Sequence, residues 1–253
     1  RHDPALRDVP GMSEPGLARL YDAIDGTWPA ANVIEAGPWR LRDGGGGGKR
    51  VSCATASGEW DRDDLAAAEQ AMRLMGQDAL FMIRAGEDTL DAALDAEGYA
   101  VINPVTLWCA PVNSLTDLEI PKVTAFAVWE PLAIMHEIWA EGGIGPARYR
   151  VMERVHGPRA AIFGRTDDKP AGAGFCAIHD GIAMVHALEI REAHRGRELG
   201  KWMMRRAAIW AQENGADWIA ALCVQENAPA NGLYASLGFE AVGEYHYRIK
   251  PET

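Results

Sequence analysis

The chain has 253 residues, which is long for one compact core and comfortable for two domains of ordinary size. Hydrophobic residues make up 48% and charged residues 24%, so the composition is that of a globular protein and excludes a disordered one. The formal net charge of −11 argues against a protein that wraps nucleic acid or lies on an anionic membrane, and it mildly favours cationic small molecules such as amines.

The cysteines and the apolar runs bear on the compartment. Cys53, Cys109, Cys176 and Cys223 form no C-x-x-C pair and have no histidine at zinc-finger spacing, so we expect free thiols in a reducing cytosol and no metal site. No run of about 18 apolar residues occurs, and the N-terminal segment has no apolar signal region. These features predict a cytoplasmic protein with no membrane span, and they leave its oligomeric state open.

The first half of the chain contains a run of five glycines, residues 44–48, followed by Lys49. A phosphate-binding loop would continue with Ser or Thr and a helix, whereas here Arg50 follows and residues 51–54 have the composition of a strand. We therefore expect a flexible hairpin. After it, the pattern predicts a helix over residues 63–75, a strand over 79–84, a helix over 89–96 and a strand from 101.

A polar stretch, residues 110–117, follows this last strand and is typical of a domain boundary. We divide the chain into an N-terminal domain (1–112), a linker (113–123) and a C-terminal domain (124–253).

The C-terminal half alternates between the two periodicities. Strands are expected over residues 124–129, 159–164, 172–178, 182–190 and 218–224 and from 240, and helices over 131–140, 147–156, 199–214 and 229–236. Antiparallel strands followed by strand, helix, strand, helix and strand predict an α+β fold with a mixed sheet. The order of strand, helix, Gly-aromatic pair and strand around Gly98 recurs around Gly238 at a shift of 140 residues, so the N-terminal half repeats part of the pattern.

Charged residues and glycines gather where the strand over residues 182–190 is followed by a helix. Arg195, Arg197 and Lys201 are basic, and Gly196 and Gly200 remove side chains where a ligand must approach the backbone. A helix start exposes unpaired N–H groups and the positive end of the dipole, so this pattern predicts an anion site. A solvated basic helix end is the plain alternative.

The sequence Arg195-Gly196-Arg197-Glu198-Leu199-Gly200 after a strand resembles the acetyl-CoA pyrophosphate loop of the GNAT superfamily of N-acetyltransferases, written Q/R-x-x-G-x-G/A. Downstream, the segment from Asn227 to Ala230 and the run Leu-Tyr-Ala-Ser-Leu-Gly-Phe at 233–239 resemble a later motif of the same family, in the right order. The whole chain is more loosely similar to bacterial tandem GNAT proteins with a degenerate N-terminal copy. Glu198 departs from the pattern because it stands where the loop usually has its middle glycine; a helical backbone there would tolerate it.

The resemblance implies roles for individual residues. Acetyl-CoA would be the co-substrate, with the loop residues Arg195, Gly196, Arg197, Glu198, Leu199, Gly200 and Lys201 at its pyrophosphate. Backbone groups near Leu188 and Ile190 would pair with the pantetheine arm, and one N–H would stabilise the oxyanion. Asn227 would bind the same arm, or it caps the following helix.

The acid and base are also implied by resemblance. Tyr234 would return a proton to the leaving thiolate, or it is a helix tyrosine that fills the core. His186 and Glu189 are both candidates for the general base or a proton relay. By strand alternation His186 shares a face with Met184, Leu188 and Ile190, as a core histidine would, unless a bulge resets the alternation.

The expected function is transfer of an acetyl group from acetyl-CoA directly to a primary amine, and the acceptor itself is not readable. Transfer of another acyl group, a non-catalytic CoA-binding module and a purely structural tandem domain are the alternatives. The N-terminal half has no Arg-Gly-x-x-x-Gly loop and has Leu94 at the position of Tyr234, so we expect it to bind no acetyl-CoA and to wall the acceptor site, together with residues 137–150.

Overall fold

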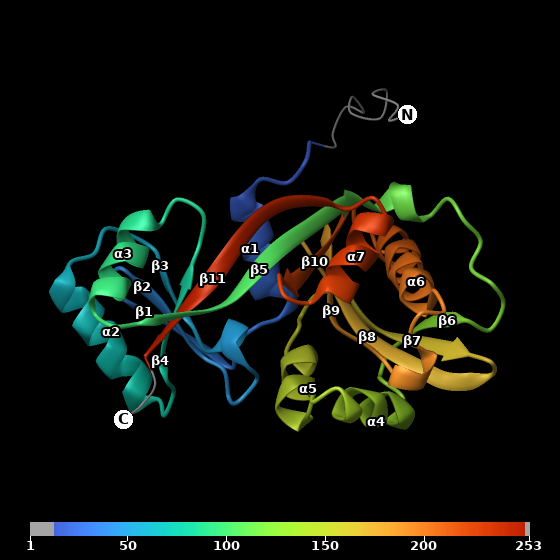
Figure 1. The fold of residues 1–253 in the computed structure, drawn as a ribbon, viewed down its shortest axis with the longest axis horizontal. Helices are drawn as coiled ribbons and strands as arrows, with labels where there is room; N and C mark the ends of the chain where they lie inside the picture. The colour runs from blue at the N-terminus through green and yellow to red at the C-terminus, as the bar shows by residue number, and fades with distance from the viewer. Residues whose placement is uncertain (1–12, 251–253) are drawn as a thin grey trace.

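The computed structural model describes residues 13–250, which build one eleven-stranded sheet with helices on both faces (Figure 1). The strands are β1 (Asn32–Ala36), β2 (Trp39–Asp43), β3 (Ala54–Ala56), β4 (Ala79–Ile83), β5 (Ala100–Pro111), β6 (Ala125–Val128), β7 (Arg159–Thr166), β8 (Lys169–His179), β9 (Ile182–Ile190), β10 (Trp218–Val224) and β11 (Glu240–Lys250). The helices are α1 (Leu17–Thr27), α2 (Arg62–Leu74), α3 (Asp88–Ala96), α4 (Ala133–Glu141), α5 (Pro146–Glu153), α6 (Leu199–Glu213) and α7 (Ala228–Ser236).

The sheet is mixed, as the sequence predicts. Its strand order is β1-β2-β3-β4-β11-β5-β10-β9-β8-β7-β6. The pairs β3–β4 and β9–β10 are parallel, and the other neighbouring strands are antiparallel. Each parallel pair is joined by a helix, α2 in the first half and α6 in the second, since parallel neighbours need a crossover.

The two halves of the chain exchange their last strands. β5, from the first half, lies between β10 and β11, whereas β11, from the second half, lies between β4 and β5. The two strands run side by side across the molecule in Figure 1. Each half therefore completes its sheet with a strand of the other. The division at residues 112 and 123 stays a prediction, and the sheet itself is continuous across it.

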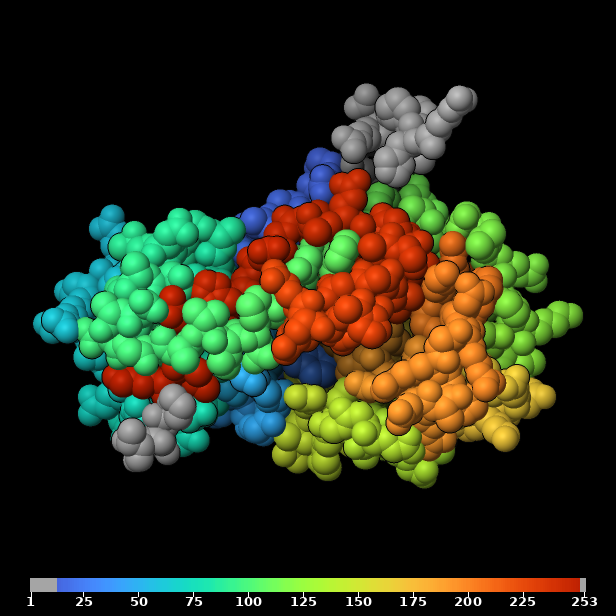
Figure 2. All heavy atoms as spheres, in the orientation of Figure 1, coloured from blue at the N-terminus to red at the C-terminus, as the bar shows by residue number. Residues whose placement is uncertain are grey.

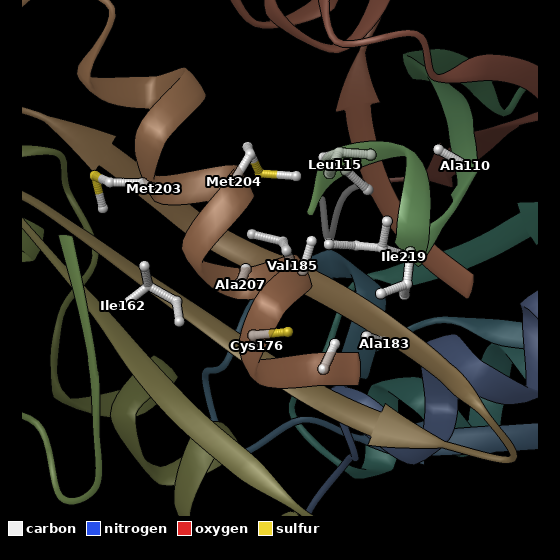
Figure 3. Close-up of a cluster of buried hydrophobic side chains, with 14 of the residues drawn as sticks. Ala110, Leu115, Ile162, Cys176, Ala183, Val185, Met203, Met204, Ala207 and Ile219 are labelled. Atoms are coloured by element: carbon white, nitrogen blue, oxygen red, sulfur yellow. The ribbon is translucent and has the colours of Figure 1, made fainter. Parts of the chain in front are cut away.

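Helix α6 shows why the apolar pattern folds as it does. Leu199, Met203, Ala207 and Ala211 recur at helical spacing and are buried on one face. Figure 3 shows this face over the sheet, with Met203, Met204 and Ala207 near Ile162, Cys176 and Val185. Burying such a face at about 25 cal/mol per Å² stabilises the helix far more than its intrinsic propensity does.

Most of the predicted elements are confirmed to within two or three residues, and the strands at 182–190 and 218–224 have the predicted bounds. The strand expected over residues 51–54 is wrong at its start, because Lys49–Val51 is a 3-10 helix and β3 begins only at Ala54. The sequence did not reveal α1, β1 or β2. Within residues 13–250, no helix has the length and apolar character needed to cross a bilayer, and no cluster of potential metal ligands is present.

Candidate active site

The site lies where two parallel strands separate. β9 and β10 are in register from Ile182 with Trp218 to Val185 with Ala221, and the pairing stops there. The last five residues of β9 pair only with β8, on the other side. This separation leaves one edge of β9 open at the carboxyl ends of the two strands, the end of a parallel pair at which α/β folds bind ligands.

A bulge in β9 sets which side chains face which way. Ala187 has φ +52°, and the four residues of β9 from His186 to Glu189 oppose only three residues of β8, Ala173 to Phe175. The Trp139 indole N–H from α4 donates to the Ala187 carbonyl at 2.8 Å and holds the bulge.

The bulge corrects the alternation expected from sequence. His186 and Met184 share the face that packs against the N-terminal half. Leu188 and Ile190 instead pack in the core beneath α6. The same shift brings His186 and Glu189 to one face of the sheet, because Glu189 reaches the junction of α4 and α5.

The loop between β9 and α6 has the backbone of an anion site. Gly196 has φ +72°, and an added Cβ would meet no atom within 4 Å, so the loop is open to solvent at this point. Glu198 is left-handed, with φ +60°, rather than helical. This position therefore does adopt the conformation that favours glycine, and Glu198 tolerates it at a cost of about 1–2 kcal/mol. Among residues 13–250 the N–H groups of Leu199 and Gly200, which open α6, have no acceptor, whereas the Lys201 N–H donates to the Glu198 carbonyl at 3.0 Å.

The basic side chains of this loop already have partners. Arg195 Nε donates to the Ile190 carbonyl at 2.9 Å, and Lys201 Nζ lies 3.0 Å from Glu198 Oε1. Arg197 forms an ion pair with Asp167. The two ion pairs are largely exposed and are each worth at most about 1 kcal/mol, so an arriving anion can replace them at little cost.

Gly200 has a packing role that its place in the motif does not reveal. A Cβ at this position would lie 3.0 Å from Leu233 Cδ2 and 3.3 Å from Ile190 Cδ1. The glycine therefore lets the start of α6 approach α7 and the end of β9. The open edge of β9, the accessible loop and the free helix amides together fit the phosphates and the extended arm of coenzyme A.

Tyr234 lies on α7 and is almost fully buried, at 5% exposure. Its ring centroid is 5.7 Å from that of Phe239 and 6.3 Å from that of Trp108. Burial raises the pKa of its phenol well above the usual value, an effect that Cys223 increases and the Arg50 guanidinium opposes. The phenol is therefore protonated at neutral pH and available as a proton donor. The ring also fills the core, as expected for a helix tyrosine, and its role as the acid stays a prediction.

Asn227 is the N-cap of α7, because its Oδ1 accepts from the Ala230 N–H at 3.2 Å. The capping role expected from sequence is therefore observed, and a role in cofactor binding stays a prediction. Asn231, which the sequence did not single out, ties α7 to two strands. Its amide N–H donates to the Val224 carbonyl at 3.0 Å, and its Oδ1 accepts from the Trp108 indole at 2.9 Å.

His186 is buried between the two halves of the chain. Its Nε2 lies 2.8 Å from Thr27 Oγ1, and its Nδ1 lies 3.0 Å from Arg50 Nη1. The Thr27 hydroxyl donates its hydrogen to the Ala23 carbonyl at 2.6 Å, so towards His186 it accepts. Nε2 must then carry the proton, and the lone pair of Nδ1 accepts from Arg50. The hydrogen bonds thus assign the neutral Nε2–H tautomer and leave no free lone pair.

The electrostatic surroundings of His186 agree with this tautomer. Burial, with the Arg50 charge beside it, holds the pKa of His186 well below its usual value. The Trp28 ring stacks on the imidazole at a centroid distance of 4.9 Å. His186 therefore orients Arg50 in this state and does not have the properties of a proton acceptor.

Glu189 has the properties of a proton acceptor to a greater degree than His186. Its side chain is half-buried, and burial raises the pKa of its carboxyl, while Arg195 and Arg148 act in the opposite direction. Its carboxyl packs against Gly142 at the junction of α4 and α5, where a Cβ would lie only 2.5 Å from Glu189 Cδ. Glu189 therefore lies at the side of the opening that residues 137–150 were expected to wall.

A hollow on the surface marks this region. Figure 2 shows it between α7, the start of α6, α5 and a part of the N-terminal half. Comparisons with known proteins bear on the family and the fold. The profile of the acetyltransferase (GNAT) family matches residues 129–239, which include the whole segment from α4 to α7. The segment from Trp129 to Phe239 belongs to the GNAT family.

Relatives extend the similarity beyond the matched segment. An uncharacterized N-acetyltransferase of Bacillus subtilis (strain 168), YobR, is 28% identical over 236 residues, which cover 88% of this chain and 94% of the relative. A GCN5-related N-acetyltransferase from Kribbella flavida has a similar structure, with a TM-score of 0.71, 20% identity and coverage of 95% of this chain and 98% of that one. A tandem GNAT protein from the clavulanic acid biosynthesis pathway gives a TM-score of 0.61 at 16% identity, with coverage of 87% and 81%.

The chain has the fold of GNAT acyltransferases. Three residues of the N-terminal half contact His186, namely Thr27, Trp28 and Arg50, and sequence reasoning missed all three. The only signal near them is the glycine run before Arg50, which the structure explains. The run packs against α5, since a Cβ at Gly47 would lie 2.6 Å from Val151 Cγ2.

Proposed function

We propose that this protein is an acetyl-CoA-dependent N-acetyltransferase that transfers the acetyl group directly to a primary amine. The observation that carries the proposal is the separation of β9 from β10 next to the open start of α6. Acetyl-CoA would supply an activated acetyl thioester. The Arg195–Lys201 segment would bind its diphosphate, and the backbone of Leu188 and Ile190 would face its pantetheine arm.

In the proposed reaction Glu189 removes a proton from the amine. A primary alkylamine has a pKa of about 10.4, so its deprotonation at pH 7 costs about 3.4 pKa units, or roughly 4–5 kcal/mol. A carboxylate whose pKa is raised by burial is a stronger base than one in water. His186 remains a candidate for a relay from the sequence, but its lone pair is already used by Arg50.

Tyr234 returns a proton to the departing thiolate. The raised pKa of its buried phenol keeps it protonated at neutral pH, so a proton is present when the thiolate leaves. Backbone N–H groups at the open edge of β9 would stabilise negative charge on the acyl oxygen, because they are fixed before the reaction begins.

The N-terminal half is proposed to bind no acetyl-CoA. Helix α2, which corresponds to α6 in the repeat, starts with a capping box formed by Asp61 and Asp64. These carboxylates occupy the helix amides that a diphosphate would need, and they repel an anion. Leu94, at the position equivalent to Tyr234, is fully buried in apolar surroundings. This half would instead complete the sheet and wall the acceptor site, as in a tandem protein with one active copy.

Calorimetric titration with acetyl-CoA, followed by measurement of thiol release with a panel of amines, tests the proposal. Binding in the micromolar range and turnover of at least one amine are expected, and substitution of Gly196 by a bulky residue should weaken the binding. Binding without turnover of any amine would indicate a non-catalytic CoA-binding module. Absence of binding at millimolar concentration would refute the assignment and favour a structural tandem domain. Repeating the assay with longer acyl-CoA thioesters decides which acyl group is preferred.

A further inference from the structure

A guanidinium from the N-terminal half lies beside β9. Arg50 belongs to the short 3-10 helix Lys49–Val51, and its Nη1 donates to His186 Nδ1. With burial, its charge holds the pKa of His186 low, and it opposes the rise in the pKa of Tyr234, which lies on the opposite face of the sheet. Arg50 therefore lies next to one of the residues that the sequence singled out.

Arg50 is partly buried, and it differs from the buried arginines Arg42 and Arg248 in having no acidic partner. Arg42 pairs with Asp25 at 2.7 Å, and Arg248 pairs with Asp91 at 2.7 Å. No carboxylate among residues 13–250 lies within 4.0 Å of Arg50. A cation that is partly withdrawn from water favours a counter-charge, because it has lost part of its hydration. We expect this counter-charge to come from a bound molecule.

Two polar atoms at this position also lack hydrogen-bond partners. Arg50 Nε and the Tyr245 hydroxyl are both buried and make no hydrogen bond of ordinary geometry. The two groups lie close together, because the Tyr245 hydroxyl acts to raise the pKa of Arg50. Buried donors of this kind are uncommon and call for an acceptor. A planar anion with two oxygens would accept from the guanidinium edge and from the hydroxyl together.

A second guanidinium lies near the base. Arg148 on α5 lowers the pKa of Glu189, and its Nε would be 3.6 Å from a Cβ at Gly48. It too has no carboxylate within 4.0 Å among the described residues. The glycine run packs the loop that bears Arg50 onto the helix that bears Arg148. This part of the molecule thus combines one carboxylate, Glu189, with two guanidinium groups that form no ion pair within 4.0 Å among the described residues.

We propose that Arg50 determines acceptor specificity by binding a carboxylate of the acceptor, with Arg148 adding to the positive field. The acceptor would then be an amine that also carries a carboxylate, as an amino acid or a compound derived from one does. His186 is the positioning residue in this arrangement, because its Nε2–H tautomer presents the lone pair of Nδ1 to Arg50. This inference rests on the proposed N-acetyltransferase function and adds the substrate class to it.

Matched pairs of acceptors provide the test: α- and ω-amino acids, each compared with the amine that its decarboxylation gives. For the wild-type protein kcat/KM is expected to be about 100-fold higher for the carboxylated member of the preferred pair, the order of magnitude of a buried charge-assisted contact. Arg50→Met should remove most of this preference, mainly through KM for the amino acid, and should change kcat/KM for the decarboxylated amine by only a few-fold. Arg50→Lys should give an intermediate preference, since it keeps the charge and loses the planar fork.

Lys49→Met is the control, because it removes the charge of the adjacent, exposed residue. It should leave the preference unchanged. The dissociation constant for acetyl-CoA, measured for each variant, reports whether the site is still folded, and Arg50→Lys serves if Arg50→Met does not fold.

Two outcomes would overturn the inference and leave the proposed function standing. One is a wild-type protein that acetylates amines with no preference for a carboxylate. The other is an Arg50→Met variant that lowers kcat/KM equally for both members of a pair, which would give Arg50 a role in the chemistry itself. If no amine of either kind is acetylated, the proposed function fails as well.

Discussion

Gly142 offers a way to displace the proposed base without changing it. This glycine is exposed at the C-cap of α4, with φ −85° and ψ 8°, a conformation open to any residue. A Cβ added there would lie 2.5 Å from Glu189 Cδ, 2.7 Å from Cγ and 2.8 Å from Oε2. Ordinary contacts need 3.4 Å or more, so the Gly142→Ala substitution must move the carboxyl by about 1 Å.

The effects on activity and on stability should differ. A displacement of about 1 Å at a reacting group can cost about 100-fold in rate, so kcat/KM should fall by that order. The free energy of unfolding should change by less than about 1 kcal/mol. The new rotamer of Glu189 costs about 0.5–1.5 kcal/mol, whereas alanine lowers the entropy of the unfolded chain and contributes about 0.4–1 kcal/mol in return.

Gly145→Ala is the matched control in the same α4–α5 connection. Its backbone is extended and an added Cβ would meet nothing within 4 Å, so its kcat/KM should equal that of the wild type. The assay is thiol release at saturating acetyl-CoA with varied amine, combined with thermal unfolding and the dissociation constant for acetyl-CoA. If Gly142→Ala is as active as Gly145→Ala, the position of the Glu189 carboxyl does not matter, and its assignment as the base is wrong.

Four further results are expected. Tyr234→Phe should lower kcat about 100-fold with an unchanged dissociation constant for acetyl-CoA, and equal activity would remove its role as the acid. Glu198→Gly should tighten acetyl-CoA binding several-fold, because it removes a carboxylate and a strained residue from the loop; calorimetry that shows weaker binding would contradict this. The kcat/KM of the wild type should rise with pH as Glu189 loses its proton, at a pH above the usual range for a glutamate, and Glu189→Gln should lack this rise. Folding lowers the pKa of His186, so its contribution to the free energy of unfolding is fully present above about pH 6.5. Below about pH 6.5 the unfolded chain takes up a proton that the folded chain does not, and the free energy of unfolding falls. In denaturant titrations below about pH 6.5, His186→Gln should lose less stability than the wild type.

The sequence alone was sufficient to predict the helices and strands of the second half of the molecule. Its helices and strands follow local periodicity, and the loop from Arg195 to Gly200 lies within one stretch of chain, so a pattern of neighbours describes it. The positions of Tyr234 and Asn227 could be read for the same reason, because each lies on a helix whose start the sequence marks. The capping of α7 by Asn227 is likewise a local interaction.

Other features depend on contacts between distant parts of the chain. The exchange of β5 and β11 joins strands that are about 140 residues apart, and no local pattern distinguishes it from pairing within each half. The bulge at Ala187 reverses the face of Leu188, and it is stabilised by Trp139 from another helix.

Contacts between distant parts of the chain also decide the protonation state of His186. His186 has a suitable position on its strand for a base, and only the hydrogen bonds from Arg50 and to Thr27, 136 and 159 residues away, occupy both of its nitrogens. A sequence pattern records the residue types available at each position. Burial, tautomer and pKa depend on which groups the folded chain brings together, and these are set by tertiary structure because electrostatic and hydrogen-bonding energies act through space over a few ångströms.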